Sequence, residues 1–171
     1  RGLGDVYKRQ GAEVTVIVGF RSKDIVILED EFKAAADRLI LMTDDGTYGR
    51  HGLVTQPLQE LLEAGETFDE VLAIGPVPMM KFVCRTTQPF GVHTMVSLNP
   101  IMVDGTGMCG GCRVTVGGET KFACVDGPEF DGHQVDFAEL TSRNGTYRDR
   151  EAEVKENHVC RIESMGKALI K

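Results

Sequence analysis

The chain has 171 residues, of which 42% are hydrophobic, and its net charge is −7. This acidic balance argues against nucleic acid or an anionic membrane surface as a partner. The sequence contains no run of 18 apolar residues, so it predicts no membrane-spanning helix. The five cysteines, three of them clustered, are not typical of a secreted disulfide framework and favour metal or redox chemistry in a reducing cytoplasm.

The first ten residues, "RGLGDVYKRQ", are treated separately from the fold. One of their reverse translations reads, in frame, as the adapter of a transposase-based sequencing library. We therefore predict that residues 1–10 are an artefact of sequence assembly and that the natural N-terminus is missing.

Strand and helix patterns alternate from residue 13 to residue 99. The β-branched runs predict strands within 13–20, 38–46, 68–76 and 91–99, and the amphipathic runs predict helices in the second half of 24–37 and over 53–65 and 77–87. Short loops between alternating elements indicate an α/β fold with a parallel sheet.

Polar residues and glycines follow three of the predicted strands, and the carboxyl ends of parallel strands are where such sheets bind ligands. As a set they favour a nucleotide site. Taken one by one, an exposed arginine or an ordinary acidic turn explains them as well. The candidate cofactor-binding residues are Arg21, Asp44, Asp45, Gly46, Gly75 and Pro76. The glycine loop that binds phosphates is absent and is expected upstream, with the first strand.

Residues 100–132 are glycine-rich and contain the three clustered cysteines, with a predicted hairpin turning on Gly117 and Gly118. The segment is too small for a hydrophobic core of its own, so we expect an inorganic group to hold it together. Residues 133–171 form a polar, partly helical tail.

The cysteine spacing predicts a plant-type 2Fe–2S site. Cys109 and Cys112 form a C-x₂-C pair, and Cys124 returns on the second strand of the hairpin. The pattern requires a fourth ligand four residues ahead of the pair, and that position is Asp104. The alternatives are a three-cysteine zinc site, or an Asp104 that only caps loop amides while Cys84 or Cys160 serves as ligand.

The remaining residues that could ligate metal or line a site are assigned no function. His51, His93, His133 and His158 share no metal-ligand spacing, and His133 is expected to be a solvated loop residue. Met79 and Met80 are expected in the core.

The segments "GFR", "TDDGTYGRHG", "IGPVPMM" and "VSLN", followed by a C-terminal cluster loop, resemble the nucleotide-binding half of ferredoxin–NADP⁺ reductase-like flavoproteins. The resemblance covers residues 11–150. It implies a partial Rossmann-like sheet in an NAD(P)-binding domain over 11–99 and a 2Fe–2S segment over 100–132.

Two subgroups of this family carry a C-terminal 2Fe–2S segment. The electron-transfer subunit of dihydroorotate dehydrogenase typically has cysteine at the first ligand position and ends soon after the last ligand. The alpha subunit of NADH-dependent reduced ferredoxin:NADP⁺ oxidoreductase has aspartate there and a tail similar to "VDGPEFDGHQVDFAEL". The chain resembles the second subgroup on both counts.

The resemblance implies an electron relay with no side chain acting as general acid or base. NAD(H) would bind at the strand ends, FAD mainly in the missing N-terminal domain, and the cluster at Asp104, Cys109, Cys112 and Cys124. The implied partner is a larger subunit with flavin and 4Fe–4S clusters, forming a heterodimer that exchanges electrons with ferredoxin. The alternatives are the dihydroorotate dehydrogenase electron-transfer subunit and a plain 2Fe–2S carrier module. Binding of NADH, and the neighbouring genes, would separate them.

Overall fold

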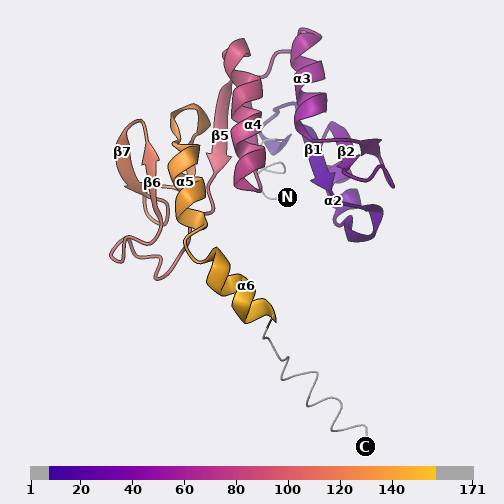
Figure 1. Ribbon diagram of the computed structural model, residues 1–171. Coiled ribbons are helices and arrows are strands. Elements are labelled where there is room, and N and C mark those ends of the chain that lie inside the picture. Colours follow the sequence, from indigo (N-terminus) through magenta and orange to yellow (C-terminus); the bar gives the residue numbers. More distant parts are fainter. Residues whose placement is uncertain (1–7, 157–171) are drawn as a thin grey trace, which may run out of the picture. The chain divides into compact units, whose positions relative to one another are not determined.

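The computed structural model describes residues 8–156. Its chain divides after Met95 into two compact units, which we treat one at a time (Figure 1). Within residues 8–156, no helix is both long and apolar enough to cross a bilayer.

The first unit contains a parallel sheet with the strand order β1-β2-β3. Strand β1 (Thr15–Phe20) pairs in register with β2 (Arg38–Thr43), and the short β3 (Arg50–His51) pairs with the end of β2. The two long strands are rich in β-branched and aliphatic residues, as buried parallel strands are. The predicted α/β class with a parallel sheet is therefore confirmed.

Three helices of this unit lie where the apolar periodicity places them: α2 (Glu29–Ala35), α3 (Thr55–Glu63) and α4 (Val77–Thr87). In α3, Leu58 and Leu62 are buried, and Gly65 follows the helix with a φ of 87°, which glycine adopts without strain. Met80 of α4 is fully buried and Met79 is half-buried, which supports their assignment to the core.

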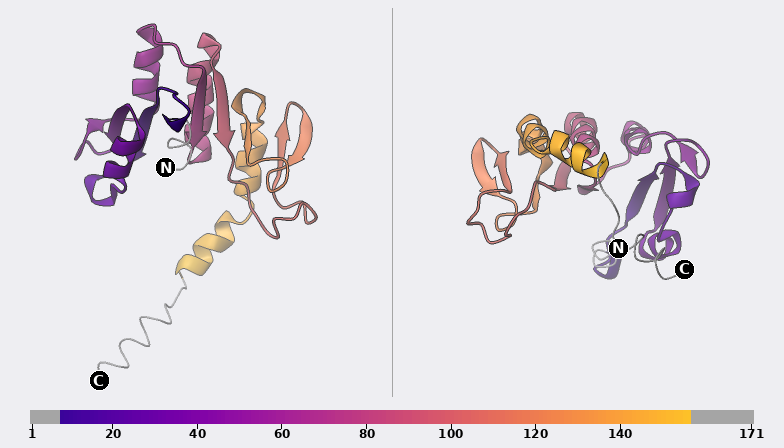
Figure 2. Two further views of the ribbon diagram at one scale, coloured as in Figure 1. Left: turned by 180° about the vertical axis from the view of Figure 1, so that it is seen from behind. Right: turned by 60° about the horizontal axis from the view of Figure 1, so that its bottom comes forward.

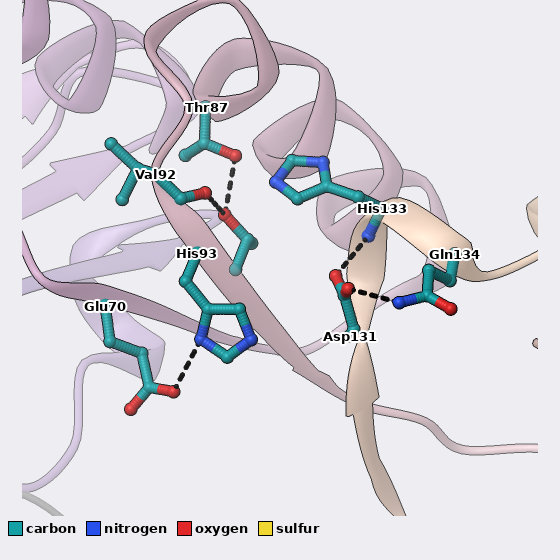
Figure 3. Close-up of polar contacts among 8 residues, drawn as sticks. Glu70, Thr87, Val92, His93, Asp131, His133 and Gln134 are labelled. Carbon is teal, nitrogen blue, oxygen red and sulfur yellow. Dashed lines mark hydrogen bonds and ion pairs between the residues drawn. The ribbon is translucent and has the colours of Figure 1, made fainter. Parts of the chain in front are cut away.

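A second sheet has the order β4-β5-β8, with β4 (Glu70–Ile74), β5 (His93–Ser97) and β8 (Glu129–Asp131). Strand β5 runs across the boundary between the units, so that β4 belongs to the first and β8 to the second. Thr87 of α4 and Thr94 of β5 have buried hydroxyls whose oxygens lie 2.6 Å apart (Figure 3). This pairing satisfies two polar groups that would otherwise be costly to bury.

Among the described residues, β1 and β4 each lie at the end of a sheet. Strand β1 pairs with β2 alone, and β4 with β5 alone. Most of β1 is only half-buried, while Leu72 and Ile74 of β4 are 37% and 61% exposed. Apolar side chains in a parallel sheet are ordinarily covered on both faces, so the exposed side chains of β4 and the half-buried ones of β1 are unusual for such a sheet.

The second unit contains an antiparallel hairpin, β6 (Arg113–Val116) and β7 (Glu119–Phe122), that turns on Gly117 and Gly118 as predicted. Both glycines have positive φ, 60° and 80°, which a two-residue hairpin turn of this type requires. Helix α5 (Phe137–Asn144) contacts β6, and α6 (Arg148–Glu156) follows with no buried residue (Figure 2). The predicted tail from residue 133 is helical in part, as expected, but α5 is no polar tail because Phe137 and Leu140 are buried in the second unit.

Candidate iron–sulfur site

The sulfur atoms of Cys112 and Cys124 lie 3.2 Å apart, with the Cys112 thiol donating to Cys124. The hairpin brings them together, because the residue before β6 meets the second residue after β7 and the Ala123 amide donates to the Cys112 carbonyl at 3.1 Å. Cys112 is only 2% exposed and Cys124 is half-buried. The neighbouring Cys112 thiol, together with burial, raises the pKa of Cys124 above its ordinary value.

Asp104 and Cys109 form a second pair in the loop before the hairpin. The Asp104 carboxylate accepts from the Thr106 amide at 2.9 Å, and this hydrogen bond, together with one from the Cys109 thiol, holds the pKa of the carboxyl below its ordinary value. Both side chains are exposed, whereas the pair formed by Cys112 and Cys124 is not.

Glycines of the same loop connect the two pairs. The Gly111 amide donates to the Cys109 sulfur at 3.4 Å, and the Gly107 amide acts to lower the pKa of Cys124 against the effects of Cys112 and burial. A methyl group placed on Gly111 would come within 3.5 Å of the Cys109 sulfur. Amide N–H groups aimed at sulfur stabilise negative charge there, which is what thiolate ligands need.

The four residues form two pairs: Asp104 with Cys109, and Cys112 with Cys124. Each iron of a 2Fe–2S cluster takes two protein ligands beside its bridging sulfides. The pairing is therefore compatible with a two-iron cluster.

Short-range hydrogen bonds hold the turn that carries Cys124. The Asp126 carboxylate accepts from the Phe122 amide at 2.6 Å, and the Asp126 amide donates back to the Phe122 carbonyl at 2.8 Å. The reciprocal pair closes residues 122–126 into a compact turn, so Asp126 fixes the direction in which Cys124 leaves the hairpin. Sequence reasoning missed this role, for which a carboxylate two residues after the last ligand is the signal.

The other cysteines and histidines do not join this site. Cys84 is buried in α4 of the first unit, and Cys160 and His158 lie outside the described residues. His93 pairs with the Glu70 carboxylate at 3.1 Å (Figure 3). His133 lies half-buried in a short 3₁₀ turn, its amide donating to Asp131 at 3.0 Å, so the expectation of a solvated loop residue is wrong.

Four of the predicted nucleotide-binding residues lie together at the carboxyl ends of β1 and β2. The Asp45 amide donates to the Arg21 carbonyl at 3.2 Å, and Asp44 donates to the Phe20 carbonyl at 3.0 Å. Gly46, with a φ of 71°, lies against the ring of His51. Arg21, Asp44 and Asp45 are exposed.

Gly75 and Pro76 lie instead at the end of β4, in the second sheet. Gly75 has a φ of 157° and a methyl group on it would come within 2.9 Å of Met79, while the Pro76 carbonyl accepts the first hydrogen bond of α4 at 3.1 Å. The predicted residues therefore form two groups, one at the end of each sheet.

Sequence reasoning missed three residues that shape the first group. The Asp45 carboxylate accepts from the Thr47 amide and hydroxyl at 3.0 and 2.6 Å, which lowers the pKa of Asp45. The Thr47 hydroxyl oxygen also accepts from the Lys23 amide at 2.9 Å, and the Lys23 ammonium lies 5.6 Å from the centre of the Tyr48 ring. The D-x-T spacing is a known Asx-turn signal, so Thr47 could have been found.

The chain is similar to several known proteins. Residues 99–136 match the iron–sulfur cluster binding domain of dihydroorotate dehydrogenase B. A protein of *Thermotoga maritima* named as a homologue of the dihydroorotate dehydrogenase B (NAD(+)) electron transfer subunit is 52% identical over 87% of this chain and 52% of its own length. An archaeal relative from *Methanocaldococcus jannaschii*, named as a probable subunit of the same kind, is 36% identical over 77% of this chain and 49% of its own.

A solved structure, described as giving insights into flavin-based electron bifurcation via the NADH-dependent reduced ferredoxin–NADP oxidoreductase structure, is 48% identical with a TM-score of 0.81. The alignment covers 91% of this chain and 55% of that one. The chain thus spans about half the length of the relatives that it matches. Over that half, it is similar to proteins named as electron transfer subunits of dihydroorotate dehydrogenase B and to the solved oxidoreductase structure, and its residues 99–136 match the iron–sulfur domain of the former.

Proposed function

We propose that this chain is part of an electron-transfer subunit that passes electrons between NAD(H), FAD and a 2Fe–2S cluster, to or from a larger partner subunit. The observation that carries the proposal is the arrangement of Asp104 with Cys109 and of Cys112 with Cys124 in two adjoining pairs. A bound 2Fe–2S cluster supplies a site that accepts and releases single electrons.

The residues around the proposed site offset the negative charge of its ligands and cover one side of it. Cys112 is buried beneath the loop, whereas Cys109 is exposed and marks the side open to an electron partner. The Gly111 amide donates to the Cys109 sulfur and so offsets its negative charge, and the Gly107 amide acts on Cys124 in the same direction. No side chain of the site needs to move a proton.

The strand ends of the first unit are the proposed NAD(H) site. Arg21 is the proposed phosphate contact, and the carboxylates of Asp44 and Asp45 are the proposed acceptors of ribose hydroxyls. The Asx turn at Asp45 and Thr47 supports this role, because it holds the loop in one conformation. Gly75 and Pro76 would leave room for the flat nicotinamide ring.

A strand from upstream sequence is proposed to lie between β1 and β4. The open edges of these strands and the exposed Leu72 and Ile74 support this, because one further parallel strand would pair with both edges. The relatives are about twice the length of the matched region, which leaves room for that strand, the phosphate-binding loop and an FAD domain.

The partner is proposed to dock beside the exposed ligands. Four apolar side chains of the same loops are at least half exposed: Met102, Val103, Met108 and Val125, the third at 89%. A methyl group on Gly107 would touch Val125, and one on Gly111 would touch Val103, so two of them lie against the glycines that contact the ligand sulfurs. Clustered exposed apolar groups are typical of a protein interface.

The complex is proposed to be the NADH-dependent ferredoxin:NADP⁺ oxidoreductase type, with ferredoxin as an indirect partner. Asp104 at the first ligand position favours it, and so does the 48% identity to the solved structure described for that oxidoreductase. A dihydroorotate dehydrogenase electron-transfer subunit is the second candidate, supported by the named relatives and the domain match. The cytoplasm is the proposed compartment for either.

Electron paramagnetic resonance of the dithionite-reduced chain, reconstituted anaerobically with iron and sulfide, tests the proposal. A rhombic spin-½ signal with an average g below the free-electron value, from equal amounts of iron and sulfide, is the expected result. Bound zinc with no such signal would make the loop structural and overturn the proposal. If a chain extended upstream does not bind NADH, the alternative of a plain electron carrier is favoured instead.

A further inference from the structure

Two arginines lie against the glycine pair between Cys109 and Cys112. The guanidinium of Arg143, in α5, donates to the Gly111 carbonyl at 3.4 Å. Arg113 lies over the adjoining glycine, its Nε 3.9 Å from the position that a Cβ on Gly110 would occupy. The two arginines differ in burial, since Arg143 is half-buried and Arg113 is exposed.

We propose that Arg143 raises the reduction potential of the iron–sulfur site, an inference that rests on the proposed function. One-electron reduction, with the electron taken from a bound reductant such as a reduced flavin, adds one negative charge to a site whose four ligands already carry negative charge. A fixed positive charge nearby stabilises the reduced form more than the oxidised form. Arg143 thus acts on the cluster through its positive charge and is not a ligand of the iron.

Helix α5 holds Arg143 against the loop. The Asp136 carboxylate caps the start of the helix by accepting from the Ala138 and Glu139 amides, both at 2.9 Å. Phe137 and Leu140 are buried, at 7% and 1% exposure, and anchor the helix beside β6. The anchored helix therefore fixes Arg143, in the last turn of α5, next to the loop.

The charge of Arg143 is not neutralised by a carboxylate. Among residues 8–156, no Asp or Glu oxygen forms an ion pair with its guanidinium, whereas Lys121 of the same unit pairs with Glu119 at 2.7 Å. In that described part of the chain, the Arg143 guanidinium is hydrogen-bonded to the Gly111 carbonyl. Its positive charge is therefore not offset by a nearby carboxylate and can act on the loop. Water screens the exposed Arg113, so the same charge there has less effect.

A purely structural role for Arg143 is the competing explanation, because the same hydrogen bond tethers α5 to the loop. A cation in the last turn also stabilises a helix through its dipole. The two explanations differ in what a charge-free donor would do. Arg143→Gln keeps an N–H donor for the Gly111 carbonyl but removes the charge, whereas Arg143→Lys keeps both.

The test is a mediated redox titration of the anaerobically reconstituted chain, followed by the visible and paramagnetic resonance signals of the cluster. Arg143→Gln and Arg143→Met are expected to shift the equilibrium toward the oxidised form by on the order of tenfold, which is about 59 mV for one electron. Arg143→Lys is expected to stay near the unmodified chain, and Arg113→Gln, the matched control, to shift by much less.

Two outcomes in the loaded variants overturn the proposal. An unchanged potential in Arg143→Gln, with the cluster still bound, would leave Arg143 as a tether only, and an equal shift in Arg113→Gln would make the effect one of net charge. If Arg143→Met fails to bind iron, the Lys and Gln variants still decide. If the unmodified chain forms no 2Fe–2S signal, the proposed function itself falls, and this inference with it.

Discussion

The Asp104 carboxylate accepts a hydrogen bond from the Thr106 amide at 2.9 Å, two residues further along the chain. An aspartate in an exposed glycine loop ordinarily faces water or caps a turn. Here it caps Thr106, and the nearby Cys109 thiol also helps to lower the pKa of its carboxyl. A carboxylate beside a cysteine of the cluster loop is where the spacing predicts a ligand pair.

Asp104→Ala is expected to weaken cluster binding, because one iron would lose its second protein ligand. Loss of iron to a chelator should speed up by on the order of tenfold or more. Asp104→Cys should retain the cluster with altered g values. Asp44→Ala, a carboxylate removed in the other unit, is the control. Unchanged iron content and spectrum in Asp104→Ala would show that Asp104 is not a ligand.

Of the four cysteines that the structure describes, three are expected to bind the cluster and Cys84 is not. Serine at Cys109, Cys112 or Cys124 is expected to lower the iron and sulfide bound per chain, because a hydroxyl is a far poorer ligand for iron than a thiolate. Cys84→Ala should leave both unchanged, since Cys84 is buried in α4 of the first unit. Iron and sulfide analysis of the reconstituted variants is the measurement, and iron loss in Cys84→Ala would contradict the assignment.

The hairpin turn should tolerate asparagine but not alanine at Gly118. This glycine has a φ of 80° and no atom within 4 Å of a Cβ, so the cost of alanine comes from backbone conformation alone. That cost is about 1 kcal/mol in the free energy of unfolding. Asparagine, which adopts the left-handed region readily, should cost less. Denaturant unfolding measures both, and equal losses would argue against this turn geometry.

The ion pair between Arg38 and Glu66 should make stability depend on pH. The Arg38 guanidinium donates to Glu66 at 3.0 Å and through a second, shorter contact, and this lowers the pKa of the Glu66 carboxyl below its ordinary value of 4.5. A lowered pKa stabilises the fold above pH 4.5, and this contribution is lost as the pH falls through the pKa of the folded state.

Glu66→Gln should therefore unfold at a lower temperature than the unmodified chain at pH 7, and the difference should disappear in acid. Thermal unfolding followed by circular dichroism across the acid range measures it. Glu63→Gln on α3, which has a side-chain partner in Gln59 but no cationic one, is the control. A difference that stays constant with pH would show that packing, not charge, is responsible.

The open edges of β1 and β4 should show in hydrogen exchange. Amides of β1 that face away from β2 are expected to exchange quickly, because no described strand accepts them, while those bonded to β2 are protected. In a chain extended upstream by the proposed strand, the same amides should become protected. Slow exchange at both faces of β1 in the present chain would argue against the open edge.

The sequence alone determined the local elements and led to the predicted ligand positions. Strands such as Thr15–Phe20 and helices such as Val77–Thr87 follow from the period of their apolar residues, which depends only on near neighbours. The spacing from Asp104 to Cys112 is likewise local, because a cluster must be reached by a few residues of one loop. The prediction of the cluster ligands rested on that spacing.

Tertiary structure decided what lies between distant parts of the chain. Nothing in the spacing says that Cys112 meets Cys124 while Asp104 meets Cys109, since that depends on how the hairpin returns. The contact of Arg143 with Gly111 joins residues 32 positions apart, and it exists because Phe137 and Leu140 anchor α5 beside β6. Such contacts arise from the burial of whole faces, which no local pattern contains.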